Sequence, residues 1–371
     1  MKESRRMHSN WTALLAIALL GSCSNRDATD GDKSKVSADR AHETSAGAVD
    51  SNPQLKYTSG IRSIFEDSKG RFWFGSHQEG VCLYDGREYV YYTVSDGLSD
   101  NQVRTIQEDR AGVMWFATGN GITSFDGDEF EIRTGGSHGS PDIAPGHAWH
   151  TEAGDLWFPG DGGMRQGIAG QGVYRYDGRA LSYLAFPLPP GVEEDNPYLV
   201  TGIVKGRDGT VWFGTYPGVF RYDGRSFTVI NDETAGIETG MERFHVRSIF
   251  EDSRGNLWIG NNGLGVLLYD GQAVANFTAQ HGLGIRDMGP SGPLSRIFSI
   301  AEDAAGNIWF GTRDNGAWRF DGESLTNFTI EDGLTSPMVW TIYRDKRDAL
   351  WFGMGDGSVC RFNGESFDRI Y

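Results

Sequence analysis

Long hydrophobic runs are almost absent from this sequence. The longest, residues 11–21 (WTALLAIALLG), is too short to cross a bilayer as a helix. Lys2, Arg5 and Arg6 precede it, and a basic start followed by a short apolar run is typical of a secretory signal. We therefore expect residues 1–22 to direct export and to take no part in the fold, and we expect no membrane-spanning helix after them.

Basic residues are also scarce relative to acidic ones. The chain has 34 Lys and Arg against 50 Asp and Glu, which gives a formal net charge of −16. Such a charge repels nucleic acids and anionic lipid headgroups, so neither is expected as a partner of the folded part. A local basic pocket remains compatible with this total.

Cysteine occurs only three times. The first apolar run ends in Leu-Gly-Ser-Cys at Cys23, which resembles the bacterial lipobox, where this cysteine is acylated and becomes the first residue. The resemblance implies a lipid on Cys23 and a place in the bacterial cell envelope, and Ser24 and Asn25 favour the outer membrane. The alternative is an ordinary cleaved signal with a chance cysteine, since small residues end every such signal.

The segment after Cys23 lacks aromatic residues altogether. Residues 24–53 also have almost no aliphatic bulk, so they cannot bury enough apolar surface to offset the entropy lost on ordering. We predict that residues 23–53 form a flexible tether between the lipid and a folded domain at 54–371.

The rest of the sequence is built from a repeat. A motif of the form D-x-x-G-x-Φ-W-Φ-G recurs seven times, and an Asp-Gly or Asn-Gly pair follows each copy. Such a pair between apolar runs is the strongest short-range signal for a β-hairpin. The tryptophans of the seven copies are Trp73, Trp115, Trp157, Trp212, Trp258, Trp309 and Trp351.

These repeats predict an all-β fold, a seven-bladed β-propeller with four antiparallel strands per blade. Units of about forty residues with four short strands and an aromatic residue at a fixed place are typical of propeller blades. A β-solenoid is the alternative, but its coils are shorter. Cys82 and Cys360 hold equivalent places in their repeats, so their side chains should not face one another and a disulfide is not expected.

The repeat resembles that of the two-component regulator propeller family. The resemblance is carried by Val246-Arg247-Ser248-Ile249 with Glu251-Asp252, by Tyr92-Thr93 with Asp96-Gly97-Leu98, and by Glu331-Asp332-Gly333-Leu334. It implies a periplasmic ligand sensor, often for oligosaccharides. Family members usually carry two such propellers before a transmembrane helix and a histidine kinase. This sequence shows none of those further parts, so we expect a stand-alone lipoprotein and carry no signalling role over.

Loop lengths indicate which face of the propeller binds. The turns with the Asp residues scarcely vary, whereas the loops on the opposite, upper face take up all the variation, and variable loops on a rigid scaffold are where binding usually resides. The variable loops are residues 134–146, 160–171, 186–198, 231–244 and 279–295. For Asp67, Asp109, Asp252 and Asp303 in the constant turns, we expect turn capping and not calcium binding.

One position in the repeat varies while its neighbours do not. It lies eleven residues before each tryptophan, at the upper end of the innermost strand, and is occupied by Arg62, Arg104, Gly146, Thr201, Arg247, Phe298 and Trp340. Three arginines around one axis would form a cationic mouth suited to a carboxylate or sulfate. The alternative is that the arginines pair with Glu66, Glu108 or Glu251.

Other candidate ligand-binding residues lie in the upper loops and in the degenerate third repeat. Trp149, Tyr216 and Trp340 would stack on sugar rings, although an aromatic residue in a strand is more often part of the core. The remaining candidates are polar or charged: His77, Arg165, Asn262, Arg313 and Asp314.

Three functions are compatible with the sequence. The first is an extracytoplasmic binding module for a glycan or another polar or anionic small molecule, sensor-like but without a kinase. The second is an interaction scaffold for another envelope protein. The third, which we do not favour, is a lyase-type enzyme in which His77 with Glu79, or His245 with Glu242, act as acid and base. Fold alone does not choose among these three functions. No cofactor, metal or catalytic residue is predicted.

Overall fold

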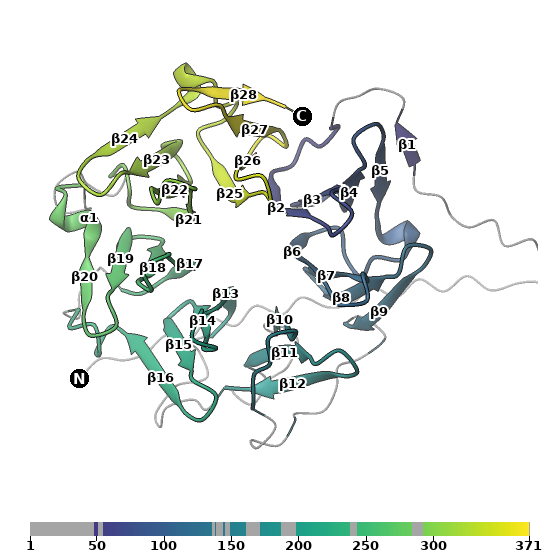
Figure 1. The fold of residues 1–371 in the computed structure, drawn as a ribbon, viewed down its shortest axis with the longest axis horizontal. Helices are drawn as coiled ribbons and strands as arrows, with labels where there is room; N and C mark the ends of the chain where they lie inside the picture. The colour runs from purple at the N-terminus through teal and green to yellow at the C-terminus, as the bar shows by residue number, and fades with distance from the viewer. Residues whose placement is uncertain are drawn as a thin grey trace, which may run out of the picture. The chain divides into compact units, whose positions relative to one another are not determined.

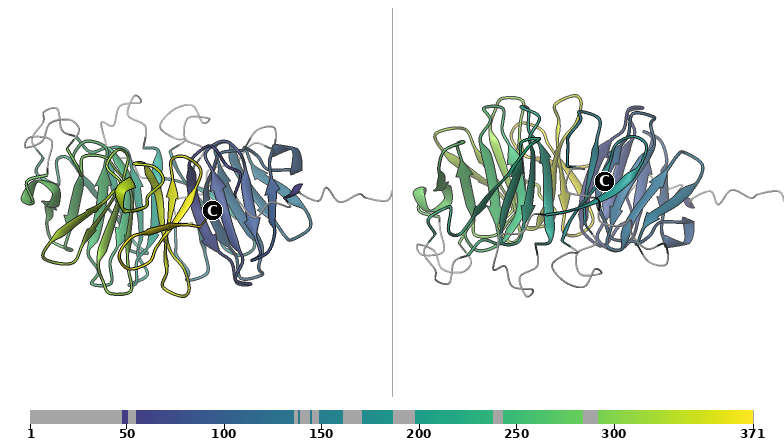
Figure 2. Two further views of the ribbon diagram at one scale, coloured as in Figure 1. Left: turned by 90° about the horizontal axis from the view of Figure 1, so that it is seen from above. Right: turned by 90° about the horizontal axis from the view of Figure 1, so that it is seen from below.

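In the computed structural model, residues Thr44–Tyr371 form one compact unit. The structure describes residues 48–50, 55–135, 138, 144, 149–160, 171–186, 198–237, 243–283 and 292–370. Seven antiparallel sheets follow one another around a central axis, as Figure 1 shows. In the side views of Figure 2 the strands run between the two faces of this ring. The fold is therefore the predicted seven-bladed propeller.

Most blades contain four strands that pair in chain order from the axis outward. Blades one and two are β2 (Ile61–Glu66), β3 (Phe72–Ser76), β4 (Val81–Tyr84), β5 (Tyr89–Tyr92) and β6 (Val103–Glu108), β7 (Met114–Thr118), β8 (Gly121–Phe125), β9 (Phe130–Thr134). Blade three is β10 (Leu156–Pro159), β11 (Gly172–Tyr176), β12 (Leu181–Ala185), and blade four is β13 (Val200–Lys205), β14 (Val211–Thr215), β15 (Gly218–Tyr222), β16 (Phe227–Asn231).

Blade five is β17 (Val246–Glu251), β18 (Leu257–Asn261), β19 (Val266–Tyr269), β20 (Val274–Asn276), followed by the short helix α1 (Phe277–Gln280). Blade six is β21 (Ile297–Glu302), β22 (Ile308–Thr312), β23 (Ala317–Phe320), β24 (Leu325–Phe328), and blade seven is β25 (Val339–Arg344), β26 (Leu350–Met354), β27 (Val359–Phe362), β28 (Phe367–Arg369).

Two blades depart from the prediction of four strands. The third sheet has three strands among the described residues, and Trp149 and His150, expected in its innermost strand, belong to no strand. The first sheet has five, because β1 (Ala48–Asp50) pairs with β5 at its outer edge. The tether predicted for residues 23–53 includes this short strand, which pairs through its backbone with an open sheet edge.

In five of the seven motif copies, an aspartate holds its own turn and its own tryptophan. In blade five, Asp252 accepts hydrogen bonds from the backbone N–H groups of Arg254 (2.9 Å) and Asn256 (2.8 Å) and from the Trp258 indole (2.9 Å). The same indole-to-carboxylate bond occurs in blades one, two, six and seven, at Trp73–Asp67, Trp115–Asp109, Trp309–Asp303 and Trp351–Asp345. These bonds show that the aspartates cap their turns, as predicted.

The glutamate before that aspartate links neighbouring blades. Its carboxylate accepts a backbone N–H from the turn of the preceding blade, at Ser68–Glu108, Arg207–Glu251 and Ser253–Glu302. The last blade makes the same bond to the first, since Lys346 donates its backbone N–H to Glu66 over 2.9 Å. The ring is thus closed by a contact that recurs between other blades.

The tryptophans fill the spaces between blades. Trp73 of blade one packs with Val103 and Phe116 of blade two. At the closure of the ring, Trp351 of blade seven packs with Ile61 of blade one and with Leu55, which precedes the first strand. Burying such side chains drives association of sheets that cannot cover both faces alone.

The two remaining cysteines, Cys82 and Cys360, lie buried in this core. That they form no disulfide with each other stays a prediction. They lie on strands β4 and β27 of different blades, each within its own apolar cluster.

Candidate functional site

All six innermost strands that the structure describes have a β-bulge. In blade one, Ile61 pairs with Ser76 and Ser63 pairs with Gly75, which leaves Arg62 without a partner. Equivalent register shifts leave out Arg104, Thr201, Arg247, Phe298 and Trp340. These are the variable positions found eleven residues before each tryptophan. A bulge turns an extra side chain out of the sheet pattern, and this explains why these positions vary while their neighbours do not.

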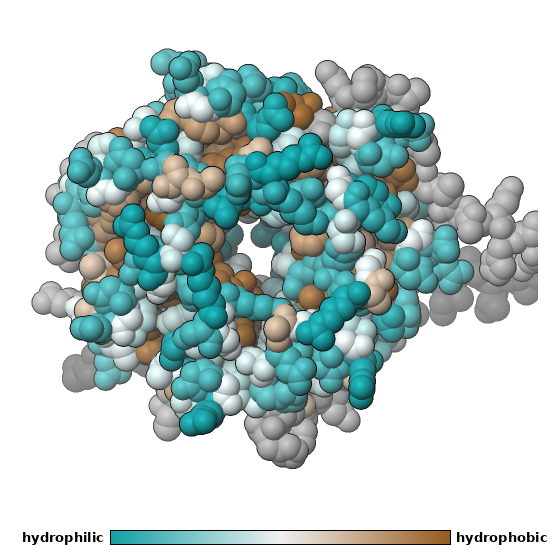
Figure 3. Space-filling model, viewed as in Figure 1, coloured by the Kyte–Doolittle hydropathy of each residue, from teal (hydrophilic) through white to brown (hydrophobic). Residues whose placement is uncertain are grey.

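The bulged residues meet in one cavity around the axis, about 400 Å³ in volume. Figure 3 shows an opening at the centre of the ring. The residues that line the cavity are Arg62, Gln102, Arg104, Thr105, Pro159, Gly160, Leu199, Val200, Thr201, Tyr216, Arg247, Phe298 and Trp340. Gly146, the seventh member of the predicted set, lies outside the described residues. We call this space the axial cavity.

Aromatic and amide groups hold the arginines of the axial cavity. The Arg62 guanidinium lies 4.9 Å from the Trp340 ring centroid, and its Nη1 is 3.3 Å from Nδ1 of His77. Arg104 donates from Nε to the Gln102 Oε1 over 2.7 Å. Neutral partners orient a guanidinium without cancelling its charge.

Arg247 is held in the same manner from the other side of the cavity. Its guanidinium lies 5.8 Å from the Tyr216 ring and 5.1 Å from the Phe298 ring. Its Nη1 also donates to the Tyr216 hydroxyl over 3.3 Å. All three guanidinium groups therefore make these hydrogen bonds and ring contacts with neutral side chains, while Asp100 acts on Arg104 through its charge.

Among the described residues, the lining of the axial cavity is positively charged. No Asp or Glu occurs among the described residues that line it, and none of the three arginines forms an ion pair with a described residue. Burial, together with the charges of Arg104 and Arg247, lowers the pKa of Arg62 to about 10. The alternative of pairing with Glu66, Glu108 or Glu251 is wrong, because those carboxylates accept bonds from turns on the opposite face.

His77 lies beside the cavity as a neutral ring. Burial and the charges of Arg62 and Arg104 lower its pKa. Both neighbours of its Nδ1, Arg62 Nη1 and Gln102 Nε2 at 3.3 Å each, are donors, so we assign Nδ1 as the acceptor and place the proton on Nε2. The ring stacks on Trp340 with centroids 5.5 Å apart. His77 thus supports Trp340 and Arg62.

Several predicted ligand-binding residues lie elsewhere. Trp149 was expected to stack on a sugar, but it does not line the axial cavity. It packs between blades three and four, with ring centroids 5.9 Å from Trp157, 5.9 Å from Phe213 and 4.6 Å from Phe227. Without an inner strand among the described residues of blade three, this indole fills the core. Arg165 lies outside the described residues.

Three further candidates form a polar patch after the second strands of blades five and six. Asp314 accepts from Arg296 over 3.0 Å and lies 3.7 Å from Arg313. The backbone of Asn262 bridges to Arg296. Asn262, Arg313 and Asp314 do not line the axial cavity, and the ion pair with Arg296 occupies the Asp314 carboxylate.

Neither of the acid–base pairs weighed from the sequence is assembled among the described residues. The carboxylate of Glu79 accepts hydrogen bonds from the backbone N–H and hydroxyl groups of both Thr58 and Ser59. Burial raises the pKa of Glu79, but the four hydrogen bonds lower it by more, so the pKa lies below its usual value. They tie Glu79 to the strand entering blade one and not to His77. Glu242 lies outside the described residues.

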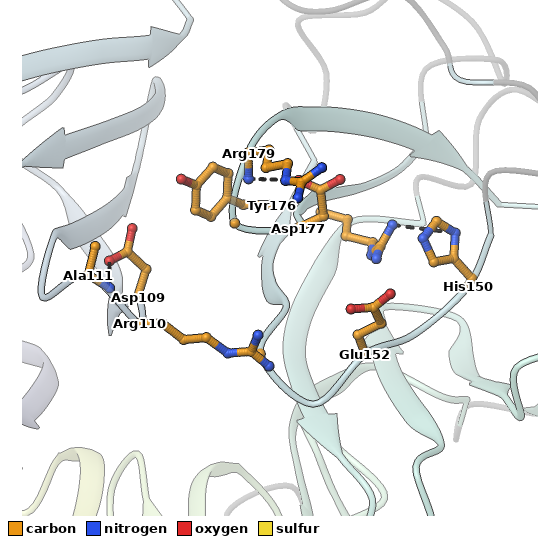
Figure 4. Close-up of a pocket in the computed structure, with 11 residues that line it drawn as sticks. Asp109, Arg110, Ala111, His150, Glu152, Tyr176, Asp177 and Arg179 are labelled. Carbon is orange, nitrogen blue, oxygen red and sulfur yellow. Dashed lines mark hydrogen bonds between the residues drawn. The ribbon is translucent and has the colours of Figure 1, made fainter.

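A second cavity, of about 490 Å³, lies on the lower face between blades two and three (Figure 4). Arg110 reaches from the blade-two turn toward the segment that carries Glu152. Arg175 also lines this cavity, but it is buried against Asp155 with a 2.6 Å ion pair. Acidic and basic side chains balance in the lining of this second cavity, so it lacks the excess of positive charge found in the axial cavity.

Gln102 is the residue of the axial cavity that sequence reasoning missed. It contacts both Arg104 and His77. Its position two residues before the bulged Arg104 would have been a usable signal, because the strand entry faces the same axis. Among the described residues there is no group of three or more His, Cys, Asp or Glu side chains placed to hold a metal ion.

The fold and the axial cavity define the class: a seven-bladed β-propeller with a cationic site on its axis. Four segments, residues 58–78, 97–120, 245–263 and 291–314, match the model of the two component regulator propeller family. They cover the two inner strands of blades one, two, five and six. No curated protein gives a significant match.

Solved structures share the fold at low sequence identity. The extracellular domain of BT3049 from B. thetaiotaomicron, described as a hybrid two component system, is 19% identical with a TM-score of 0.62 over 85% of this chain and 40% of that chain. The corresponding domain of BT4673 is 22% identical, with a TM-score of 0.58 over 85% and 38%. PorZ, a surface component of the type-IX secretion system of Porphyromonas gingivalis, is 18% identical, with a TM-score of 0.55 over 82% and 46%.

This chain therefore spans about two fifths of the length of the two B. thetaiotaomicron domains, and the likeness concerns the fold. No helix in the described part of the chain is both long and apolar enough to cross a membrane.

Proposed function

We propose that this propeller binds a small anionic ligand, such as an acidic saccharide, in the axial cavity. The observation that carries the proposal is the convergence of Arg62, Arg104 and Arg247 on one cavity whose described lining has no carboxylate. In a protein with a formal net charge of −16, such a cluster is a local inversion of charge. Guanidinium groups bind carboxylate and sulfate oxygens in pairs, which gives both strength and orientation.

The dimensions and the other walls of the cavity support a small polar ligand. A volume of about 400 Å³ lies within the usual range for small-molecule sites. The oxygens of Thr201 and Tyr216 lie beside the arginines as further polar groups of the lining. Trp340 already contacts Arg62, His77 and Phe298, so we assign it to holding Arg62 in place.

Isothermal titration calorimetry with acidic and neutral sugars tests the proposal. We expect glucuronate or galacturonate oligosaccharides to bind and their neutral counterparts to bind at least tenfold more weakly, a difference of about 1.4 kcal/mol. Arg104→Gln should weaken acidic-sugar binding by about tenfold or more. The control is Arg87→Gln, in an exposed turn of blade one that does not line the cavity. Equal affinity for acidic and neutral sugars would overturn the proposal.

We also propose that the protein is exported and held in the bacterial cell envelope by a lipid on Cys23, where the propeller acts as a sensor-like binding module. The basic and apolar start of the chain and the lipobox-like residues before Cys23 support this. The extracellular location of the B. thetaiotaomicron domains is consistent with it.

Replacing the lipid-bearing residue tests the anchor. Cys23→Ser should move the protein from the membrane fraction to the soluble fraction of the envelope, because no acyl chain is then attached. Cys82→Ser, at a buried thiol of the core, is the control and should leave the fractionation unchanged. Membrane retention of the Cys23→Ser protein would argue against a lipid anchor.

An interaction scaffold for an envelope protein is the competing proposal. It predicts that affinity capture from envelope extracts recovers the same partner with the Arg104→Gln protein as with the natural one. The ligand-binding proposal requires Arg104 for recognition.

A further inference from the structure

Resting on the proposed function, we infer that the axial cavity selects ligands whose anionic group carries two negative charges over ligands of the same shape that carry one. This inference rests on the positions of Arg62, Arg104 and Arg247. They lie at the bulges of three inner strands, β2, β6 and β17, and their guanidinium groups line one cavity. A binding site with a single guanidinium would be neutralised by one negative charge. This site has three guanidinium groups, so it keeps positive charge after one negative charge has bound.

The guanidinium groups are held close together in the cavity despite their mutual repulsion. The Trp340 ring lies under Arg62, and the Phe298 and Tyr216 rings lie beside Arg247. Gln102 holds Arg104 through its amide oxygen. These neutral contacts restrain the side chains near the axis, so the positive charges are present before a ligand arrives. Preorganised charge of this kind adds to affinity because little ordering remains to be done on binding.

The three charges interact with one another. Burial is the main cause of the lowered pKa of Arg62, followed by the charges of Arg104 and Arg247. The pKa of Arg104 is lowered by burial too, with Arg247 among the smaller contributions. A second negative charge on the ligand therefore meets positive potential that the first has not cancelled, and Coulomb attraction in a partly buried site is stronger than in water.

Other titratable groups near the arginines do not account for such selectivity. His77 and His245 have pKa values lowered by burial and by neighbouring arginines, so both are neutral at pH 8 and would gain positive charge only in acid. Asp100, beside Arg104, accepts the backbone N–H of Gln102 over 2.7 Å and forms no ion pair with a described residue. At pH 8 none of these groups favours the doubly charged ligand, because both histidines are neutral and Asp100 is negatively charged.

Glucose 6-phosphate and glucose 6-sulfate provide a matched pair of probes. The sulfate ester has one negative charge at any pH used here, whereas a phosphate ester gains its second charge above a pKa of about 6. By calorimetry on the purified protein at pH 8, we expect the phosphate ester to bind about tenfold more tightly than the sulfate ester. At pH 5, where about nine tenths of the phosphate ester carries one charge, the ratio of the two affinities should fall to about twofold. Using their ratio cancels any effect of His77 or His245, since both probes experience it equally.

Variants link the selectivity to the arginines. Arg104→Gln should reduce the phosphate-to-sulfate ratio at pH 8 to about threefold, and Arg87→Gln should leave it unchanged. Equal binding of the two esters by the natural protein at pH 8 would overturn the inference and leave the proposed function standing. If neither ester nor any acidic sugar binds, the inference and the proposed function both fail.

Discussion

Replacing Asp252 with alanine is expected to lower the free energy of unfolding by about 3 kcal/mol. The carboxylate is buried and accepts four hydrogen bonds, from two backbone N–H groups, the Asn256 side chain and the Trp258 indole, all at 2.8 to 2.9 Å. Its loss leaves these donors unsatisfied beside a large core side chain. Urea unfolding followed by tryptophan fluorescence would measure the change.

The control for this experiment is an aspartate that caps a turn without reaching the core. Asp270 accepts only the backbone N–H groups of Gln272 and Ala273, both at 2.8 Å, in an exposed turn of the same blade. Water replaces such bonds readily, so Asp270→Ala should be markedly less destabilising. If the two variants lose equal stability, the indole-to-carboxylate bond does not have the role assigned to it here.

Gly353→Ala should destabilise the closed ring by about 2 kcal/mol. Gly353 ends the Trp-Phe-Gly of blade seven, where the blade packs on the first inner strand. A Cβ at this position would lie 2.7 Å from the backbone oxygen of Ile61 and 2.7 Å from Cγ2 of Thr341. Because the carbonyl belongs to a hydrogen-bonded strand, it cannot move aside cheaply. Urea unfolding again gives the magnitude.

Gly214, at the same place in blade four, is the matched control. Its Cβ would meet only side-chain carbons, at 3.1 Å from Cγ2 of Ile249 and 3.2 Å from Cγ1 of Val246, which shift more readily than backbone. Gly214→Ala should therefore cost less than about 1 kcal/mol. A larger loss for Gly214→Ala than for Gly353→Ala would contradict the account of ring closure by backbone contact.

The repeat predicted the architecture because each part of the motif has a local task. The aspartate caps its own turn, the tryptophan fills the space to the next blade, and the Asp-Gly pair forms a hairpin turn. Such local signals survive without knowledge of distant contacts. The glutamate was harder to interpret, because its partner is the turn of the preceding blade, about 40 residues away at Ser68–Glu108 and 280 at Lys346–Glu66.

Failures of prediction occurred where the motif weakens. In blade three, Thr151 stands where blades one, two, five, six and seven have the capping aspartate, and no described residue accepts a hydrogen bond from the Trp157 indole. Trp149, in the degenerate inner-strand pattern of this repeat, was proposed to stack on a ligand with a place in the core as the alternative, and packing places it in the core. The strand β1 was missed because its pairing comes from the open edge of β5 and not from its own side chains.

The sequence by itself determined the number of blades, the direction of the strands and the residue in each repeat that differs from blade to blade. It did so because turns, alternation and capping are local properties of the chain. Only the tertiary structure decided that the variable residues share one axial cavity, that their arginines lack carboxylate partners among the described residues, and that Trp340 supports Arg62. The reason is that a bulge on each inner strand and the closure of the ring bring residues as distant as 62 and 340 into contact, which no local pattern encodes.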